Sequence, residues 1–289
     1  MATPAPRTLA AVNACSRDAL VTALGSIFEH APWVAEAAAT RRPFATVAAV
    51  HKAMVDALWQ ADPESQLAVI RAHPELGSQV ARADLTAASL AEQGSLGLDR
   101  LSAEEFARFT QLNAGYRARF GFPFIICVRR HTRDSILRQF ERRLGNDAAA
   151  ERAAALDEIA LITRLRLTAM LDGPGKPKTD GRLTTHVLDL VTGRPAAGVR
   201  LALYEVGASV RGLLRNGVTN GDGRTDAPLI AGEPLRIGSY ELQFGIGDYF
   251  GGAGFFGMVP VRFSIAEPEG HYHVPLLATP WSYTTYRGS

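Results

Sequence analysis

The chain has 289 residues, 21% of them charged, and a formal net charge of only +2 at pH 7. This balance gives no electrostatic reason to expect nucleic acid or an anionic membrane as partner, and no stretch approaches the roughly 20 apolar residues that span a bilayer. The length suggests two domains. The first residues are too polar for a secretory signal, and Cys15 and Cys127 lack metal-ligand spacing, so we expect reduced thiols in a cytoplasmic protein.

The first half of the chain is predicted to be helical. Apolar and aromatic residues recur there at steps of three and four, the spacing of one helix face. One helix follows a capping box formed by Ser102 and Glu105 and ends before Gly121. Another ends before Gly145, and a third is rich in alanine with no internal Gly or Pro. We expect these three helices over residues 106–120, 136–144 and 147–171.

A linker and a change of period follow. The segment LDGPGKPKTDG, residues 171–181, concentrates Gly, Pro, Lys and Asp between patterns of different period. Beyond it apolar residues alternate, as at Val199, Leu201 and Leu203, and turn clusters separate the runs. Short strands at this spacing predict a small antiparallel sandwich. The expected organisation is an all-α domain over residues 1–171, a linker over 172–181 and an all-β domain over 182–289.

Ionisable residues in the second half suggest chemistry. In LTTHVLDL, alternation places His186 on the strand face of Leu188, so an imidazole should face an apolar layer. In HYHVPLL, His271 and His273 share a strand face, and in TNGDGRTD Arg224 emerges from a turn. Each also has an ordinary interpretation, as a hydrogen-bonded core histidine or a solvated turn arginine. The HxH pair could also be two zinc ligands, although no nearby carboxylate or Cys completes a ligand set.

Together these motifs are similar to one family over residues 182–289: 5-hydroxyisourate hydrolase, the enzymatic relative of transthyretin. The matching stretches are LTTHVLDLVTGRPAAGV, TNGDGRTD, SYELQF and HYHVPLLATPWSYTTYRGS. The resemblance implies catalytic roles for His186, Arg224 and His273, and a homotetramer with active sites at a subunit interface. It also implies that the last four residues close the site and bind substrate: Tyr286, Arg287, Gly288 and Ser289.

The chemistry of hydrolysis suits these residue types. An imidazole can take the proton of an attacking water near pH 7, so one of the two histidines is the expected base. The guanidinium of Arg224 keeps its charge and can stabilise a developing oxyanion, so neither metal nor cofactor is expected. The alternative is a transthyretin-like carrier of small ligands fused to a helical interaction domain. The family pattern disfavours it, because carriers lack the His/Arg/His set and the YRGS ending.

Two further candidates lie in the first half. In QLAVIRAHPELGS a helix should end at His73, because Pro74 disfavours the helical conformation of the residue before it. The helix dipole would raise the pKa of His73 and make it a proton donor; a capping histidine is the structural alternative. Glu92 lies three residues after Ser89, a spacing that also fits a capping box.

An arginine in the long predicted helix is the third candidate. Arg166 projects into an apolar stripe of that helix, whereas Arg164 points away from it. The stripe consists of Leu156, Ile159, Ile162, Thr163, Ala169 and Met170. A buried guanidinium needs an anion, which could be a structural carboxylate or a substrate.

These features lie in stretches that resemble a second family from about Leu20 to Leu171: 2-oxo-4-hydroxy-4-carboxy-5-ureidoimidazoline (OHCU) decarboxylase. The stretches are IFEHAPWVAEAA, RRPF, QLAVIRAHPELGS, SLAEQGSLGL, LNAGYRARFGFPFIICVR and EIALITRLRL. The resemblance implies catalytic roles for His73, Glu92 and Arg166, no cofactor, and dimer contacts through this domain. It implies substrate contacts by Pro74, Ser89, Gln93, Phe124, Ile125 and Ile126, the last three on a strand.

The two resemblances imply consecutive steps on one small polar substrate. The hydrolase converts 5-hydroxyisourate to OHCU, and the decarboxylase converts OHCU to (S)-allantoin. Arg166 would hold OHCU, His73 would polarise or protonate it, and Glu92 would orient its ureido and hydroxyl groups. No chemical role is predicted for the remaining histidines, His30, His51 and His131.

Overall fold

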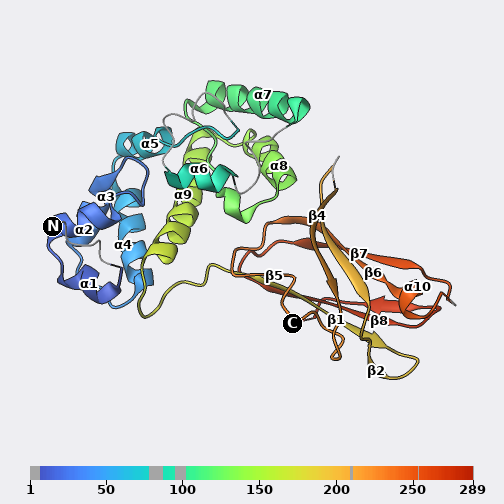
Figure 1. Cartoon of the computed structure of the whole chain (residues 1–289). Coiled ribbons are helices and arrows are strands. Elements are labelled where there is room, and N and C mark those ends of the chain that lie inside the picture. Colours follow the sequence, from blue (N-terminus) through green and yellow to red (C-terminus); the bar gives the residue numbers. More distant parts are fainter. Residues whose placement is uncertain (1–6, 78–86, 95–101, 209–210, 253, 289) are drawn as a thin grey trace. The chain divides into compact units, whose positions relative to one another are not determined.

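The computed structural model describes residues 7–77, 87–94, 102–208, 211–252 and 254–288. For the helix at 87–94, the structure does not describe the side chains of Ala87, Leu90 and Gln93. The chain forms two compact units, one of Met1–Arg129 with Ile136–Lys178 and one of Arg130–Ser135 with Thr179–Ser289. The first is helical and the second is built of strands (Figure 1).

The helical half consists of one long helix of 23 residues and several shorter ones. Side-chain caps begin several of them, such as Thr46 before α4 and Asp62 before α5. The elements in chain order are α1 (Leu9–Ala14), α2 (Arg17–Leu24), α3 (Pro32–Ala39), α4 (Val47–Gln60), α5 (Pro63–Arg71), α6 (Ala87–Gly94), α7 (Ala103–Phe120), the 3₁₀ helix η2 (Val128–Arg130), α8 (Arg133–Arg143) and α9 (Ala148–Met170).

The three helices predicted from periodicity are confirmed as α7, α8 and α9. Ser102 and Glu105 form both hydrogen bonds of the capping box at the start of α7. Gly121 ends that helix in the left-handed region, with φ 74°, which favours glycine because it has no Cβ. Asp147 caps α9 by accepting from the backbone N–H of Ala150 at 2.8 Å.

The apolar stripe predicted on α9 is only partly right. Leu156, Ile159 and Thr163 are buried as expected, but Ala169 and Met170 are exposed. Other positions, among them Leu165 and Leu167, are buried on other sides of the helix. The reason is that α9 lies inside the unit, where α4 and α5 both contact it, so it does not present a single face to the core.

The FGFPFII segment, residues 120–126, was expected to be a strand and is not one. Past Gly121 it runs as buried, irregular backbone. Side chains bond to the backbone at its end: Arg143 Nη1 donates to the carbonyl of Ile125 at 2.7 Å, and Glu158 accepts from the backbone N–H of the following residue, Cys127, at 2.8 Å. These two backbone groups therefore have partners without a neighbouring strand.

The second unit contains two sheets, which confirms the predicted sandwich of short strands. Its elements are β1 (Arg182–Asp189), β2 (Arg194–Pro195), β3 (Arg200–Val206), β4 (Arg211–Val218), β5 (Ile230–Ala231), β6 (Gly238–Gly245), α10 (Ile246–Tyr249), β7 (Met258–Ile265), β8 (His271–Ala278) and β9 (Tyr283–Thr285). One sheet has the order β2-β1-β8-β9, with β5 also paired to β1, and the other has the order β4-β3-β6-β7.

Two details of this sandwich correct the sequence interpretation. β1 and β8 pair in parallel, not antiparallel, over their full lengths, which their distance along the chain allows since a parallel pair cannot be joined by a short hairpin. The core face of β1 holds Leu183, Thr185 and Val187. His186 therefore lies on the opposite, half-exposed face and does not face the apolar core.

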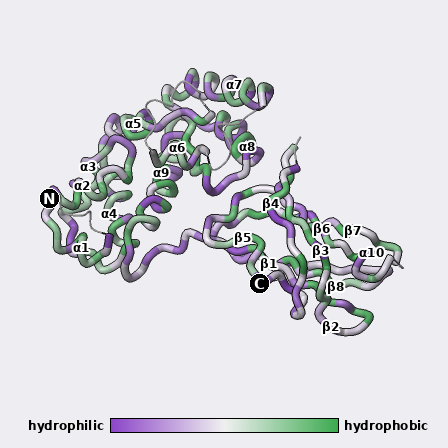
Figure 2. Tube along the Cα trace, in the orientation of Figure 1, coloured by the Kyte–Doolittle hydropathy of each residue, from purple (hydrophilic) through white to green (hydrophobic). Residues whose placement is uncertain are grey.

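The segment between α9 and β1 is hydrophilic over most of its length (Figure 2). Its first part is attached to the helical unit: the carbonyl of Asp172 accepts from the N–H of Leu9 at 2.8 Å, and that of Pro174 from Val47 at 2.9 Å. No described helix is long and apolar enough to cross a membrane.

Candidate active sites

Arg166 is the centre of the first candidate site, in the helical unit. Its guanidinium projects from α9 and is 8% exposed. Nε and Nη2 donate to the two carboxylate oxygens of Glu92 at 3.0 and 2.8 Å, and Nη1 donates to Glu29 at 2.8 Å. Burial alone would lower the pKa of Arg166, but hydrogen bonds and charge from Glu92 and Glu29 outweigh it and raise that pKa. The anion that meets Arg166 in this structure is therefore a pair of carboxylates.

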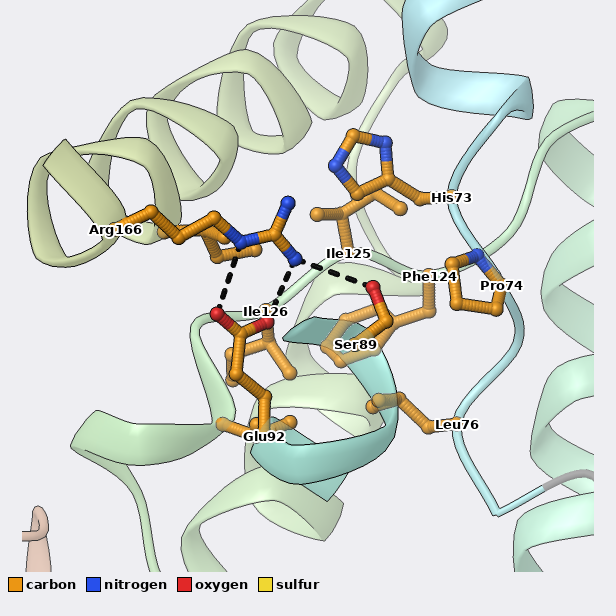
Figure 3. Close-up of a pocket in the computed structure, with 11 residues that line it drawn as sticks. His73, Pro74, Leu76, Ser89, Glu92, Phe124, Ile125, Ile126 and Arg166 are labelled. Atoms are coloured by element: carbon orange, nitrogen blue, oxygen red, sulfur yellow. Dashed lines mark hydrogen bonds and ion pairs between the residues drawn. The ribbon is translucent and has the colours of Figure 1, made fainter. Parts of the chain in front are cut away.

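Ser89 and Glu92 both lie inside α6, so their three-residue spacing is not a capping box. The spacing instead places both side chains on one helix face, toward Arg166. Ser89 is buried and its Oγ accepts from Arg166 Nη2 at 3.1 Å. Figure 3 shows both side chains pointing at the guanidinium.

His73 follows the end of α5, as predicted, but its protonation differs from the prediction. Burial lowers its pKa, an effect only partly opposed by the carbonyl of Val69 and by Glu29. The helix dipole does not prevail, because an imidazole removed from water loses more solvation than the dipole returns. Nδ1 lies 2.9 Å from the Val69 carbonyl, so Nδ1 carries the proton. Nε2, without a hydrogen-bond partner among the described residues, is then a free base.

These residues line one cavity (Figure 3). His73, Ser89, Glu92 and Arg166 supply its polar wall. Its other wall includes Pro74, Leu76, Phe124, Ile125, Ile126 and Ile162. Nearly all the residues predicted for this site are thus brought together. Gln93 lies on α6, and its side chain is outside the described part of the chain.

Glu29 belongs to this cluster and was not predicted. It lies in the loop between α2 and α3 and is 2% exposed. The available signal was an acidic residue inside the family-like stretch IFEHAPW, surrounded by apolar residues. Charge in such a setting calls for a partner of opposite charge, and that partner proved to be Arg166.

The second candidate site lies on one face of the sheet that contains β1 and β8. In the parallel register Thr184 is opposite His273, and His186 lies two residues further along the same face of β1. Thr184 Oγ1 lies 2.8 Å from His273 Nδ1 and 3.0 Å from His271 Nε2, so one hydroxyl bridges the two rings. This face points away from the core, which is formed by the alternate residues.

The charge of Arg224 reaches both histidines. Arg224 lies in the turn after β4 and is exposed. Burial lowers the pKa of His186 and of His273, and the positive charge of Arg224 lowers each of them further. The electrostatic influence of His186 on His273 completes a mutually interacting set of three. Both imidazoles are therefore in the neutral form near pH 7.

The end of the chain runs alongside β8 and pairs with it at His273. The N–H of Gly288 donates to the carbonyl of His273 at 2.9 Å, and Arg287 lies over the Tyr272 ring at 4.6 Å from its centroid. Tyr286, Arg287 and Gly288 line an open cavity of about 560 Å³ together with His271 and His273. Ser289 lies outside the described residues.

Known proteins resemble each half of the chain separately. Residues 13–168 match the family OHCU decarboxylase, and residues 183–288 match the HIUase/Transthyretin family. The chain is 45% identical over 160 residues to the 2-oxo-4-hydroxy-4-carboxy-5-ureidoimidazoline decarboxylase of Haloferax volcanii, covering 55% of this chain and 94% of that protein. It is 52% identical over 116 residues to 5-hydroxyisourate hydrolase 2 of Rhizobium meliloti, covering 38% of this chain and 97% of that protein.

A solved structure resembles both halves together. The crystal structure of an (S)-allantoin synthase matches with 32% identity and a TM-score of 0.52, covering 98% of this chain and 100% of that one. With its helical half matched to one family and its sandwich to another, the chain belongs to the OHCU decarboxylase family and, through its second half, to the HIUase/Transthyretin family.

Proposed function

We propose that the chain is a bifunctional enzyme of urate degradation, in which the domain at residues 182–289 hydrolyses 5-hydroxyisourate and the domain at residues 1–171 decarboxylates the product, OHCU, to (S)-allantoin. The observation that carries the proposal is that each half has its own cluster of imidazole and guanidinium groups, in the half that matches the corresponding family. Imidazole bases and cationic groups suffice for both reactions, so the proposal includes neither metal nor organic cofactor.

In the decarboxylase half, the neutral Nε2 of His73 is the proposed base. The carbon that loses CO₂ also bears a hydroxyl group. As the C–C bond breaks and CO₂ leaves, its electron pair forms a C=C bond to the neighbouring ring carbon, and the electron pair of the ring C=N bond moves to nitrogen, which takes a proton from water. Nε2 accepts the hydroxyl proton. A proton then returns to one face of the ring carbon that bears the ureido group. Because a single imidazole in a fixed position delivers this proton to one face, only one enantiomer of the product forms.

Glu92 and Arg166 complete the decarboxylase half of the proposal. The Glu92 carboxylate, held by two hydrogen bonds from Arg166, orients substrate N–H and hydroxyl donors. Pro74 and Ser89, which line the cavity, contribute to binding, as do the walls formed by Phe124, Ile125 and Ile126. The family resemblance adds Gln93 to the binding residues.

In the hydrolase half, His186 or His273 takes the proton of the attacking water. Arg224 stabilises the negative charge that develops on the ring oxygen. Tyr286 to Ser289 close the site over the substrate. Because this site lies on an outward sheet face, we include a homotetramer that covers that face. The family resemblances add dimer contacts through the helical domain and a cytoplasmic location to the proposal.

The test supplies freshly made 5-hydroxyisourate and follows its absorbance together with the circular dichroism of the product. We expect rapid, optically active (S)-allantoin. His73→Ala should accumulate OHCU, and His273→Ala should leave 5-hydroxyisourate to decay at its uncatalysed rate. Optically active product formed at the parent rate by the His73 variant would overturn the decarboxylase assignment. A carrier would bind 5-hydroxyisourate without changing its decay.

A further inference from the structure

The hydroxyl of Thr184 joins two histidines on the sheet face that carries the second candidate site. The parallel register of β1 and β8 places Thr184 directly opposite His273. Thr184 Oγ1 lies 2.8 Å from Nδ1 of His273 and 3.0 Å from Nε2 of His271. His271 and His273 are two residues apart on β8, so both rings lie on the same face of that strand. The three side chains form a row of hydrogen bonds with the hydroxyl at its centre.

The imidazole of His273 is held on two sides. Its Nδ1 faces Thr184, and the backbone of Gly288 lies close to the other side, since a Cβ added to Gly288 would be 2.7 Å from Cδ2 of the ring. The N–H of Gly288 also donates to the carbonyl of His273 at 2.9 Å. Nε2 is the ring nitrogen that neither contact uses, and His273 lines the open cavity of this site.

The number of protons limits how the three side chains can bond. A threonine hydroxyl has one O–H donor. It can donate to only one of the two ring nitrogens, so the other ring must donate its own N–H to Thr184 Oγ1. If His273 donates, its Nδ1 carries the ring proton and Nε2 has a lone pair. If His271 donates, Thr184 donates to Nδ1 of His273, and the ring proton of His273 is on Nε2.

One of these two directions makes His273 a base. Burial and the positive charge of Arg224 lower the pKa of His273, so the ring carries a single proton near pH 7. A general base must offer a lone pair to the attacking water. Because Nδ1 is engaged by Thr184, this lone pair has to be on Nε2, which requires the proton on Nδ1. Thr184 then accepts from His273 and donates to His271.

We propose that Thr184 is a positioning residue of the hydrolase site, which accepts from Nδ1 of His273 and donates to Nε2 of His271, so that Nε2 of His273 is the base. This inference rests on the proposed hydrolase function and selects His273 from its two candidate bases. His271 acts one step further away, as the acceptor of the Thr184 proton.

The proposed direction persists through the reaction. As the oxygen of water bonds to the ring carbonyl carbon, the carbonyl electron pair moves to its oxygen and one water proton passes to Nε2 of His273. When the carbonyl re-forms, the C–N bond breaks, and the ring nitrogen leaves with the bonding pair and takes that proton. Nδ1 of His273 remains a donor to Thr184 in both states of the imidazole, so no proton has to move between the two residues.

The test compares Thr184→Val with the parent, using freshly made 5-hydroxyisourate, with decarboxylation of supplied OHCU as the reference activity. Val keeps the branched shape and removes the hydroxyl. We expect hydrolase kcat to fall about 10- to 100-fold with a smaller change in KM, and decarboxylation to stay at the parent rate. Thr184→Ser keeps the hydroxyl and should restore most of the rate. The matched control is Thr179→Val, at a half-buried threonine ahead of β1, which should change neither activity.

A variant of His271 tests the direction of the hydrogen bonds. His271→Leu removes the acceptor of the Thr184 proton, which lets the hydroxyl donate to Nδ1 of His273 and favours the tautomer with Nε2 protonated. We expect a fall in kcat of about 3- to 10-fold. The double variant with Thr184→Val should be no slower than Thr184→Val alone, because His271 acts through Thr184.

Nitrogen-15 NMR of protein labelled at histidine measures the tautomer independently of activity. Protonated and unprotonated ring nitrogens differ in chemical shift, and the signals of His273 are those missing from His273→Gln. We expect a proton on Nδ1 and none on Nε2 at neutral pH. A proton on Nε2, parent-like hydrolysis by Thr184→Val, a Thr184→Ser variant as slow as Thr184→Val, or additive losses in the double variant would each overturn the proposal. Absence of hydrolysis by the parent would instead refute the proposed function.

Discussion

The two candidate sites differ in which groups pair with their charged side chains. In the helical unit, the Arg166 guanidinium is shielded from water and pairs with two carboxylates of the same unit, those of Glu29 and Glu92, each at 2.8 Å. On the sheet face, Arg224 and the end of the chain are exposed, and His186 and His273 are half-exposed. A buried site must pair its charges within its own fold, whereas an open face can leave them to solvent, substrate or a second subunit. The first site should therefore depend on internal partners and the second on what covers it.

The largest expected effect is that of Arg166→Met. It leaves Glu29 and Glu92 without their shared cation in a buried setting, which typically costs about 3–5 kcal/mol. We expect loss of decarboxylase activity by more than about 1000-fold and lower stability of the helical unit, with the hydrolase retained. Urea unfolding and the two activity assays measure this. Arg17→Met, at an exposed ion pair, is the control. A stable helical unit in Arg166→Met would contradict the internal pairing described above.

A smaller effect, confined to the hydrolase, is expected from Gly288→Ala. A Cβ at this position would lie 2.7 Å from Cδ2 of His273, so the ring or the terminal segment must shift. We expect hydrolase kcat/KM to fall about 10-fold or more, since a small displacement of a catalytic group can cost this much. Decarboxylation of supplied OHCU should not change. Gly212→Ala is the control, because a Cβ there meets nothing within 4 Å. Equal rates in the two alanine variants would show that the terminal segment does not set the position of His273.

The pH dependence of hydrolysis should report the charge of Arg224. Because burial and Arg224 lower the pKa of His186 and His273, the acidic limb of kcat/KM should lie below the ordinary imidazole value of about 6.5. Arg224→Gln removes a positive charge that opposes protonation, so both pKa values rise and the limb moves to higher pH. The rate maximum should fall as well if Arg224 stabilises the oxyanion. A limb that does not move would place Arg224 outside the electrostatic reach of the base.

The smallest expected effect concerns stability of the helical unit. Burial lowers the pKa of His51 to about 4, although the carbonyl of Ala160 opposes the shift, and its Nε2 lies 3.1 Å from Thr163 Oγ1. The unfolded chain binds this proton at about pH 6.5, so unfolding free energy should decrease as pH falls from 6.5 toward 4. The slope is at most about 1.4 kcal/mol per pH unit for one proton. His51→Gln should flatten it, as measured by unfolding at several pH values; an unchanged slope would assign it to other groups, such as His73.

Local patterns predicted the parts of the fold that depend on neighbours in sequence. The capping box at Ser102, the left-handed Gly121 and the start of α9 at Asp147 each follow from backbone preferences of a few residues. The failures arise where distant segments decide. Residues 120–126 are irregular backbone, in which the distant Arg143 provides the partner of the Ile125 carbonyl. The core face of β1 was misassigned because alternation identifies two faces without telling which one is buried.

The sequence by itself determined the two domain types, the families to which they belong and most of the residues that gather at the two sites, because these follow from periodicity and from motifs of several residues. Tertiary structure alone decided the protonation of His73, the pairing of Arg166 with Glu29, and the face on which His186 lies. The physical reason is that desolvation and charge pairing depend on groups far apart in the chain, such as Glu29 and Arg166, and no local pattern records their separation.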